Sequence, residues 1–218
     1  PRHDPPQRLL AGGQEVLIVK PSATIEQITP DALRLVERAG RTCYQSEPSE
    51  GGPEGFIAQV IKRGHLSVLE HASMTVRFVV DRGVSHELVR HRIASYSQES
   101  TRYCAYSRER FGGQVTFVEP PGLTDEMHNR WTLACLGSEM SYLELIRMGA
   151  SAQLARSVLN HSVKTEVVMT ANFREWRTVF ELRTARDAHP QMREVMIPLL
   201  VAARQEVPAV FDDVGVTE

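Results

Sequence analysis

The segment from Arg90 to Arg102 restricts what this chain can fold into more than any other stretch. Its thirteen residues include three arginines, a histidine, a tyrosine, a glutamine, a glutamate and four Ser or Thr hydroxyls, and only Ile93 and Ala94 are plainly apolar. A core position is excluded, because burying so many charges without partners costs several kcal/mol for each ion. Arginine binds phosphate through paired hydrogen bonds, and hydroxyls with backbone N–H groups complete such a site. The segment therefore predicts a surface site for a phosphorylated, nucleotide-like ligand, although a solvated basic face fits its composition equally well.

The overall composition is typical of a soluble globular enzyme. Of 218 residues, 42% are apolar and 24% are charged, and the net charge is −2, so a substantial core is possible. The near-neutral charge weighs against a dedicated nucleic-acid binder. No apolar run approaches the roughly 20 residues that cross a bilayer, and the N-terminus lacks a signal-peptide segment. Cys43, Cys104 and Cys135 have neither disulfide nor zinc-site spacing, which predicts a reduced, cytoplasmic protein.

Expected strands and helices are interspersed along the whole chain. The strands are expected at 15–20, 74–80, 114–118 and 165–170, and the helices at 32–39 with Gly40 as a stop, 54–64, a short one capped by Ser85, 124–148, 151–159, 173–185 and 191–205. Residues 1–13 are expected to form a flexible polar arm. With no repeat and no clear boundary, we expect a single α+β domain over 1–218, with a mostly antiparallel central sheet flanked by long helices.

The helix that begins at Phe173 carries charge on both of its faces. At about 100° per residue, four large apolar side chains share one face: Phe173, Trp176, Val179 and Phe180. Arg183 falls on that same face, and the opposite side carries Arg174, Arg177, Thr178 and Glu181. Arg183 either pairs with carbonyls at the helix C-terminus or reaches a ligand in a partly dry site. Because Arg174 and Arg183 face opposite ways, one ligand in one protomer can hardly touch both.

Two other classes of function stay open at this point. His86-Glu87-Leu88-Val89-Arg90-His91 is superficially similar to the H-E-x-x-H helix of zinc proteases, but its histidines are five residues apart instead of four. A metallohydrolase would need a third ligand, for which His65, Glu70 and His71 are candidates. Segment 90–110 could alternatively bind single-stranded nucleic acid, since single strands require basic groups between aromatic side chains. The residues concerned are Arg90, Arg92, Arg102, Arg108, Arg110, Tyr96, Tyr103 and Tyr106.

Ordered motifs between His65 and Arg183 resemble those of the flavin-dependent thymidylate synthases. They are Gly64-His65-x-Ser67-x-x-Glu70-His71, Arg90-His91-Arg92 followed by seven residues and then Ser100, Ser95-Tyr96-Ser97-Gln98-x-Ser100-x-Arg102-Tyr103, and Asn172-Phe173-Arg174-Glu175-Trp176-Arg177 with Leu182-Arg183. The resemblance implies conversion of dUMP to dTMP, with methylenetetrahydrofolate as carbon donor and NADPH-reduced FAD as hydride source. It also implies no cysteine nucleophile, no metal, and a homotetramer whose active sites are shared between subunits.

The resemblance also assigns roles to individual residues. FAD would be bound by Ser67, Arg90, His91, Arg92, Gln98, Asn172, Phe173, Arg174 and Thr178. dUMP would be bound by Glu87, Leu88, Val89, Arg90, Gln98, Glu99, Ser100, Thr101, Arg102, Arg156 and Arg183. Arg183 would be catalytic, because its guanidinium can stabilise negative charge on uracil when the ring imide loses a proton. Ser100 is assigned to binding, since no His-Asp pair is evident to activate it.

Three further positions bear on this assignment. His65 would help to position folate or flavin. Thr178 departs from the His or Asn that the family often has at that FAD contact. Glu87 replaces a common Gln, and its carboxylate would repel a phosphate. We therefore expect Glu87 to act through its backbone, or to touch the uracil or the sugar.

Overall fold

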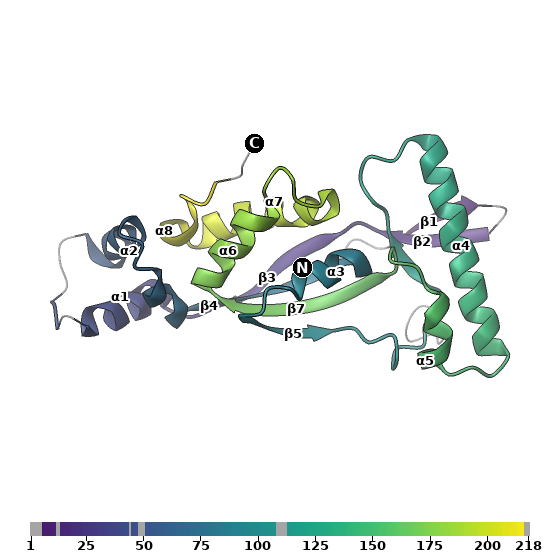
Figure 1. Cartoon of the computed structure of the whole chain (residues 1–218), viewed down its shortest axis with the longest axis horizontal. Helices are drawn as coiled ribbons and strands as arrows, with labels where there is room; N and C mark the ends of the chain where they lie inside the picture. Colours follow the sequence, from purple (N-terminus) through teal and green to yellow (C-terminus); the bar gives the residue numbers. More distant parts are fainter. Residues whose placement is uncertain (1–5, 12–13, 44, 48–50, 108–112, 216–218) are drawn as a thin grey trace. The chain divides into compact units, whose positions relative to one another are not determined.

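The computed structural model describes residues 6–11, 14–43, 45–47, 51–107 and 113–215. The strands are β1 (Gln7–Ala11), β2 (Gln14–Val19), β3 (Ser22–Ile28), β4 (Ser73–Asp81), β5 (Ala94–Gln98), β6 (Thr116–Val118) and β7 (Lys164–Asn172) (Figure 1). The helices are α1 (Ala32–Thr42), α2 (Gly52–Lys62), η1 (Leu66–His71), α3 (Arg82–Leu88), α4 (Asp125–Arg147), α5 (Ala152–Ala155), η3 (Arg156–Val158), α6 (Phe173–Arg183), α7 (Pro190–Glu206) and α8 (Pro208–Phe211).

The strands form two sheets, with orders β1-β2-β6 and β3-β4-β7-β5. β1 pairs with β2 in antiparallel register, and β2 pairs with β6 in parallel. The chain divides into two compact units: the α4 unit (Pro1–Ser22, Phe78–Leu88 and Ser97–Val167) and the α6 unit (Ala23–Arg77, Val89–Tyr96 and Val168–Glu218). The expected α+β class with antiparallel pairing is confirmed, and a single domain over 1–218 remains a prediction.

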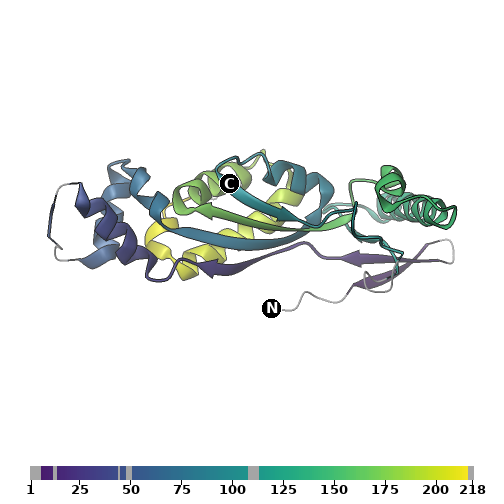
Figure 2. The same cartoon turned by 90° about the horizontal axis from the view of Figure 1, so that it is seen from below.

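The α4 unit packs one long helix against the β1-β2-β6 sheet (Figures 1 and 2). Its buried core includes Ile18, Phe117 and Tyr142, each at most 5% exposed. α4 begins where the sequence predicts, because the Thr124 side chain accepts a hydrogen bond from Met127 N at 3.3 Å. The capped start fixes the register in which the apolar face of α4 meets the sheet.

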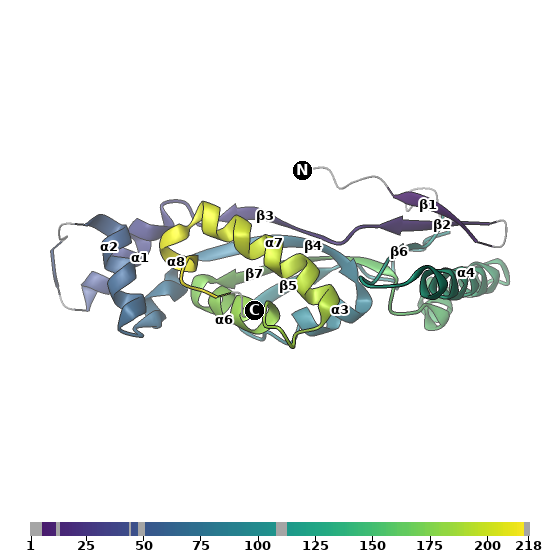
Figure 3. The same ribbon diagram turned by 90° about the horizontal axis from the view of Figure 1, so that it is seen from above.

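The α6 unit places α6 and α7 side by side over its strands (Figure 3). Phe211 packs edge-on against Phe173 and Phe180, with ring centroids 5.6 Å apart in both pairs. The Trp176 indole donates to Met74 O on β4 at 2.8 Å. Asn172 caps the helix, since its Oδ1 accepts from Glu175 N at 2.8 Å. The apolar face predicted for this helix is thus confirmed, and it fixes the direction of every polar residue that α6 carries.

Some helix boundaries differ from the predicted ones. Gly40 does not end α1 but lies inside it. A Cβ at this position would lie 2.5 Å from Phe56 Cζ, so the absence of a side chain allows the Phe56 ring to pack against the helix. Ser85 lies inside α3, which begins three residues earlier; Asp81 Oδ1 accepts from Val84 N at 2.9 Å. The helix expected over 151–159 is split between α5 and η3. Gly40 therefore does not mark the end of α1, and Ser85 does not mark the start of α3.

Some strands were not expected at all. β3 and β5 lie in stretches to which the sequence analysis assigned no element, and β1 occupies part of the arm expected over 1–13. Residues 1–5 and 12–13 of that arm lie outside the described residues. Within the part of the chain that is described, no helix is long and apolar enough to cross a membrane.

Candidate functional site

His91 lies at the centre of a polar cluster in the α6 unit. Its Nε2 accepts a hydrogen bond from Arg183 Nε at 2.9 Å, and its Nδ1 lies 3.5 Å from Glu175 Oε1. The Tyr96 hydroxyl donates to His91 O at 2.8 Å. Because an arginine Nε can only donate, His91 Nε2 must carry a lone pair. The imidazole is therefore neutral in this arrangement, with its proton on Nδ1 facing the carboxylate.

The electrostatics of this cluster agree with a neutral ring. Burial, and then the positive charge of Arg183, lower the pKa of His91 from 6.5 to about 4. Burial raises the pKa of Glu175, while Arg174 acts in the opposite direction. Burial and the Glu175 carboxylate raise the pKa of Tyr96 to about 12. At neutral pH the cluster therefore presents one fixed positive charge, the Arg183 guanidinium, anchored on a neutral imidazole.

The lowered pKa of His91 predicts an acid-sensitive native state. Between pH 4 and 6.5 the unfolded chain binds a proton on His91 that the folded chain does not, so stability rises with pH across this window. The free energy of unfolding should therefore fall by about 3 kcal/mol more in the wild type than in His91→Asn when the pH drops from 7 to 4. Glu175 opposes this trend above pH 4.5, since its folded pKa is raised. Urea unfolding at several pH values measures the difference, and parallel curves for the two proteins would contradict the assignment.

The segment η1 lies beside the start of α6. Arg174 Nη1 donates to Glu70 Oε1 at 2.6 Å, and Phe173 N donates to Ala72 O at 2.9 Å. These contacts bring the exposed Ser67 and the Asn172–Arg174 segment into one neighbourhood. Two motifs that are about 100 residues apart in sequence therefore meet in space, as the resemblance requires.

The remaining predicted FAD residues of this unit divide by exposure. Arg90 and Arg92 are exposed, and neither forms a hydrogen bond or ion pair with another described residue. Thr178 is exposed and its hydroxyl donates to Arg174 O at 3.4 Å. Phe173 is fully buried, so only its backbone could touch a ligand. These two exposed guanidiniums, two residues apart in sequence, could bind an anion through paired hydrogen bonds.

Arg177 corrects the predicted orientation of α6. Helical periodicity places it on the outer side with Arg174 and Thr178, but it is only 6% exposed. Its guanidinium donates to Val210 O and makes two hydrogen bonds to the Asp213 carboxylate, at 2.5 and 2.7 Å. The C-terminal segment covers this side of the helix, which periodicity within α6 cannot reveal.

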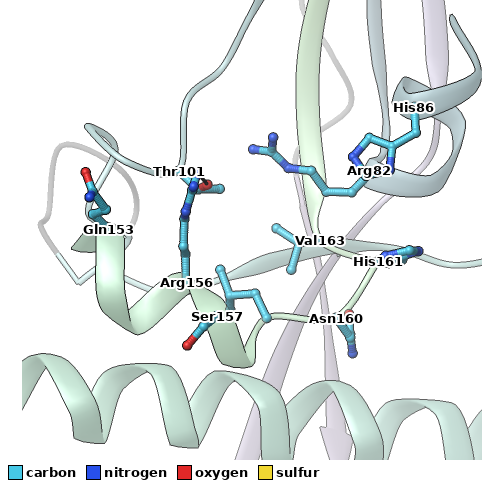
Figure 4. A pocket seen from close by; sticks show the side chains of 10 residues that line it. Arg82, His86, Thr101, Gln153, Arg156, Ser157, Asn160, His161 and Val163 are labelled. Carbon is cyan, nitrogen blue, oxygen red and sulfur yellow. Dashed lines mark hydrogen bonds between the residues drawn. The ribbon is translucent and has the colours of Figure 1, made fainter. Parts of the chain in front are cut away.

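A cavity of about 490 Å³ lies in the α4 unit (Figure 4). Its polar lining includes Arg82, His86, Thr101, Gln153, Arg156 and His161. Figure 4 shows the guanidinium of Arg156 reaching from η3 to Thr101, and that of Arg82 pointing from α3 toward the same space. Arg156 Nη1 donates to Thr101 Oγ1 at 3.2 Å, and Arg82 Nη2 donates to Glu99 O at 3.0 Å. Two guanidiniums and a hydroxyl around one cavity are typical of an anion site.

The segment 98–102 is held in place mainly by hydrogen bonds within this unit. Gln98 Nε2 donates to Ser85 Oγ at 3.0 Å and to Thr165 Oγ1 at 3.3 Å. The Glu99 carboxylate accepts from Tyr106 Oη at 2.8 Å and from Lys164 Nζ at 2.9 Å. Lys164 Nζ also donates to Glu166 Oε1 at 2.7 Å, so one ammonium group is shared between Glu99 and a second carboxylate.

The other predicted dUMP residues of this region also have definite positions. Ser100 Oγ accepts from Arg102 N at 3.3 Å, and Arg102 Nε donates to Gln153 Oε1 at 3.0 Å. Leu88 is fully buried at the end of α3, so only its backbone could reach a ligand. Glu87 is half-buried, whereas Val89, in the α6 unit, is 40% exposed.

Neither alternative function gains support from the side chains. Tyr106 is 6% exposed and cannot stack on a base, and Arg108 and Arg110 lie outside the described residues. Among the residues that the structure describes, no three His, Cys, Asp or Glu side chains gather into a possible metal site. The site residues that sequence reasoning missed are Arg82, Lys164, His161 and Glu175. Arg82 and His161 lack a local signal because distant segments bring them to the cavity, and Lys164 because its partner Glu99 is 65 residues away. Glu175 lay unremarked within a quoted motif.

Comparison with known proteins identifies the chain. Residues 24–209 match the family described as thymidylate synthase complementing protein. The chain belongs to this family. Flavin-dependent thymidylate synthases of Mycobacterium avium and Mycobacterium bovis (strain BCG / Pasteur 1173P2) are both 36% identical to it, over 201 and 205 residues. These alignments cover 82% and 84% of this chain, and 78% and 80% of the relatives.

Solved structures of related proteins have the same fold. Thymidylate synthase X from Helicobacter pylori, crystallised with FAD and dUMP, is 27% identical with a TM-score of 0.72. The match covers 91% of this chain and 100% of that one. A UMP/dUMP methylase from Streptomyces cacaoi is 23% identical with a TM-score of 0.75, over 92% of this chain and 98% of that one. The second likeness shows the fold alone.

Proposed function

We propose that this member of the family is an FAD-dependent thymidylate synthase. It converts dUMP to dTMP, taking the methylene group from methylenetetrahydrofolate, with NADPH reducing the FAD. The hydrogen bond from Arg183 to His91 carries the proposal, since it joins the Arg90-His91-Arg92 motif to the arginine that the resemblance makes catalytic. The two residues are 92 positions apart in sequence, so a chance surface arginine would not be expected to end on this histidine.

The donor set of the α6 unit fits FAD. The exposed guanidiniums of Arg90 and Arg92 can each donate two hydrogen bonds to a phosphate, which suits a pyrophosphate, and Ser67 adds an exposed hydroxyl. When bound, FAD supplies the hydride that completes the methyl group. We keep as proposed FAD-binding residues Ser67, Arg90, His91, Arg92, Gln98, Asn172, Phe173, Arg174 and Thr178. Phe173 takes part through its backbone because its ring is buried.

The proposed dUMP residues lie in both units. In the α4 unit, Arg156 and Thr101 offer a guanidinium and a hydroxyl to a phosphate at the cavity. In the α6 unit, Arg183 offers a guanidinium to a pyrimidine. A guanidinium held in place before the reaction stabilises the negative charge that develops on uracil, without having to reorganise. The full proposed set is Glu87, Leu88, Val89, Arg90, Gln98, Glu99, Ser100, Thr101, Arg102, Arg156 and Arg183.

The proposed reaction does not use a cysteine nucleophile. Burial raises the pKa of the Cys135 thiol to about 11, which leaves it protonated and inert at neutral pH. All three cysteines are free thiols, which supports a reducing compartment such as the cytoplasm. We also propose a homotetramer with shared sites. Arg174 and Arg183 are nine residues apart on α6 and so face opposite ways, which suits ligands held between subunits.

Release of tritium from dUMP labelled at ring carbon 5, together with dTMP formation, tests this function. Both should require FAD, NADPH and methylenetetrahydrofolate, and omission of any one should stop them. Alkylation of the exposed Cys43 should leave the rate unchanged, since no thiol takes part. Methylation that persists without flavin, or purified protein that forms no dTMP with all components present, would contradict the proposal.

A further inference from the structure

We propose that Glu175 is a positioning residue for this reaction: its carboxylate holds His91 with the proton on Nδ1, so that Nε2 anchors the Arg183 guanidinium. The proposal rests on the function proposed above for Arg183. Glu175 itself need not touch the substrate. It acts in two steps: the carboxylate attracts the His91 Nδ1–H across 3.5 Å, and His91 Nε2 accepts the hydrogen bond from the Arg183 guanidinium.

The geometry of the three side chains allows one assignment of protons. Arg183 Nε donates to His91 Nε2 at 2.9 Å, and His91 Nδ1 faces Glu175 Oε1 at 3.5 Å. The side chains of His91 and Glu175 are only 6% and 12% exposed, so little water competes for either nitrogen. A neutral imidazole has one N–H, and its location is decided by whichever partner accepts it. Of the two neighbours of the ring, only the Glu175 carboxylate can accept this proton, because a guanidinium has no acceptor atom.

The Glu175 carboxylate can orient His91 because it is not needed to cap the start of α6. The Asn172 side chain already caps α6 by accepting from Glu175 N at 2.8 Å. Arg174, next to Glu175 in sequence, pairs with Glu70 at 2.6 Å. The Tyr96 hydroxyl holds the His91 carbonyl at 2.8 Å, so the backbone of His91 is fixed independently of its ring. Glu175 therefore determines the orientation and the tautomer of the His91 ring, and not the position of its backbone.

Removal of the Glu175 carboxylate should weaken the hydrogen bond between Arg183 and His91, while the Arg183 side chain itself is retained. A neutral His91 that lacks the acceptor at Nδ1 can move its proton to Nε2. That N–H would then oppose the Arg183 N–H, and the guanidinium would lose its hydrogen bond to His91. A displaced catalytic group lowers turnover even though substrate binding elsewhere is intact. We expect kcat of Glu175→Ala to fall about tenfold, with KM for dUMP changed much less.

The experiment combines the histidine tautomer with kinetics. Ring-labelled ¹⁵N histidine in the full-length holoenzyme distinguishes Nδ1–H from Nε2–H, and His91→Asn identifies the His91 signal by its loss. We expect Nδ1–H in the wild type and a gain of Nε2–H in Glu175→Ala. Glu175→Gln keeps an oxygen acceptor and should recover the Nδ1–H signal and most of the lost kcat. Glu181→Ala, on the exposed side of the same helix, is the matched control and should change neither.

The outcomes separate this inference from the proposed function. An Nε2–H signal in the wild type would overturn it without any variant, even if Glu175→Ala failed to fold. Wild-type tautomer and wild-type kcat in a folded Glu175→Ala would also overturn it. If the wild type shows Nδ1–H but forms no dTMP, the proposed function fails, and the kinetic role proposed for Glu175 fails with it. Loss of kcat with the Nδ1–H signal retained would reduce Glu175 to a structural role and overturn the proposal.

Discussion

Replacing Arg183 with alanine should lower kcat for dTMP formation by about 10²–10³. The guanidinium is the fixed positive charge of the His91 cluster, and a prearranged donor of this kind stabilises the transition state much more than the bound substrate. FAD binding should persist in the variant, because the proposed phosphate donors Arg90 and Arg92 are unchanged. Single-turnover measurement of dTMP formation at saturating dUMP separates this loss from any loss of affinity.

Two further variants sharpen the test of Arg183. Arg183→Lys keeps the charge but loses the Nε–H that donates to His91, so its kcat should fall between those of the wild type and Arg183→Ala. Arg186→Ala removes an exposed arginine three residues along the chain and should turn over normally. If Arg183→Ala retained a rate close to that of Arg186→Ala, the catalytic assignment would be wrong.

Replacing Asp213 with alanine should lower the free energy of unfolding by about 3 kcal/mol. The change leaves the buried Arg177 guanidinium with Val210 O but without its carboxylate partner. This loss of stability is at the low end of the range for breaking a buried ion pair. The reason is that the Asp213 side chain is 51% exposed, so water can replace part of the interaction. The hydrogen bonds from Arg177 lower the pKa of Asp213. Its contribution is therefore complete above pH 3.8 and is lost as the pH falls through the lowered value.

Urea unfolding at pH 7 measures this effect. Asp212→Ala removes a neighbouring exposed carboxylate and should change stability by less than about 0.5 kcal/mol. The double variant Arg177→Met with Asp213→Ala should recover part of the loss, because an apolar pair carries no uncompensated charge. Equal stabilities of Asp213→Ala and Asp212→Ala would show that the pair does not hold the C-terminal segment.

Local patterns in the sequence predicted the elements whose cause is local. The apolar face of α6 and the Thr124 cap of α4 follow from side-chain period and capping chemistry. β5 was missed because Ala94–Gln98 is polar and has no apolar alternation; its place in the sheet beside β7 makes it a strand. Arg177 was misplaced because its partner Asp213 lies 36 residues away. Elements that depend on distant partners are the ones that periodicity cannot predict.

In the candidate site, too, features with a local cause were predicted and contacts between distant residues were not. The motifs pointed separately to His91 and to Arg183, but nothing in either motif predicts that the two side chains meet. Glu175 was part of a quoted motif, yet its direction toward His91 becomes visible only when α6 is capped and packed. The opposed directions of Arg174 and Arg183 did follow from sequence, because both lie on one helix.

The central claim is that this chain binds FAD and dUMP together. The most direct measurement is the flavin absorption spectrum of the purified, FAD-reconstituted protein during titration with dUMP. FAD should stay bound through gel filtration, and its spectrum should change with dUMP until the site is saturated, while deoxyuridine, which lacks the phosphate, should have little effect at the same concentrations. A protein that does not retain FAD, or a bound flavin whose spectrum does not respond to dUMP, would contradict the claim.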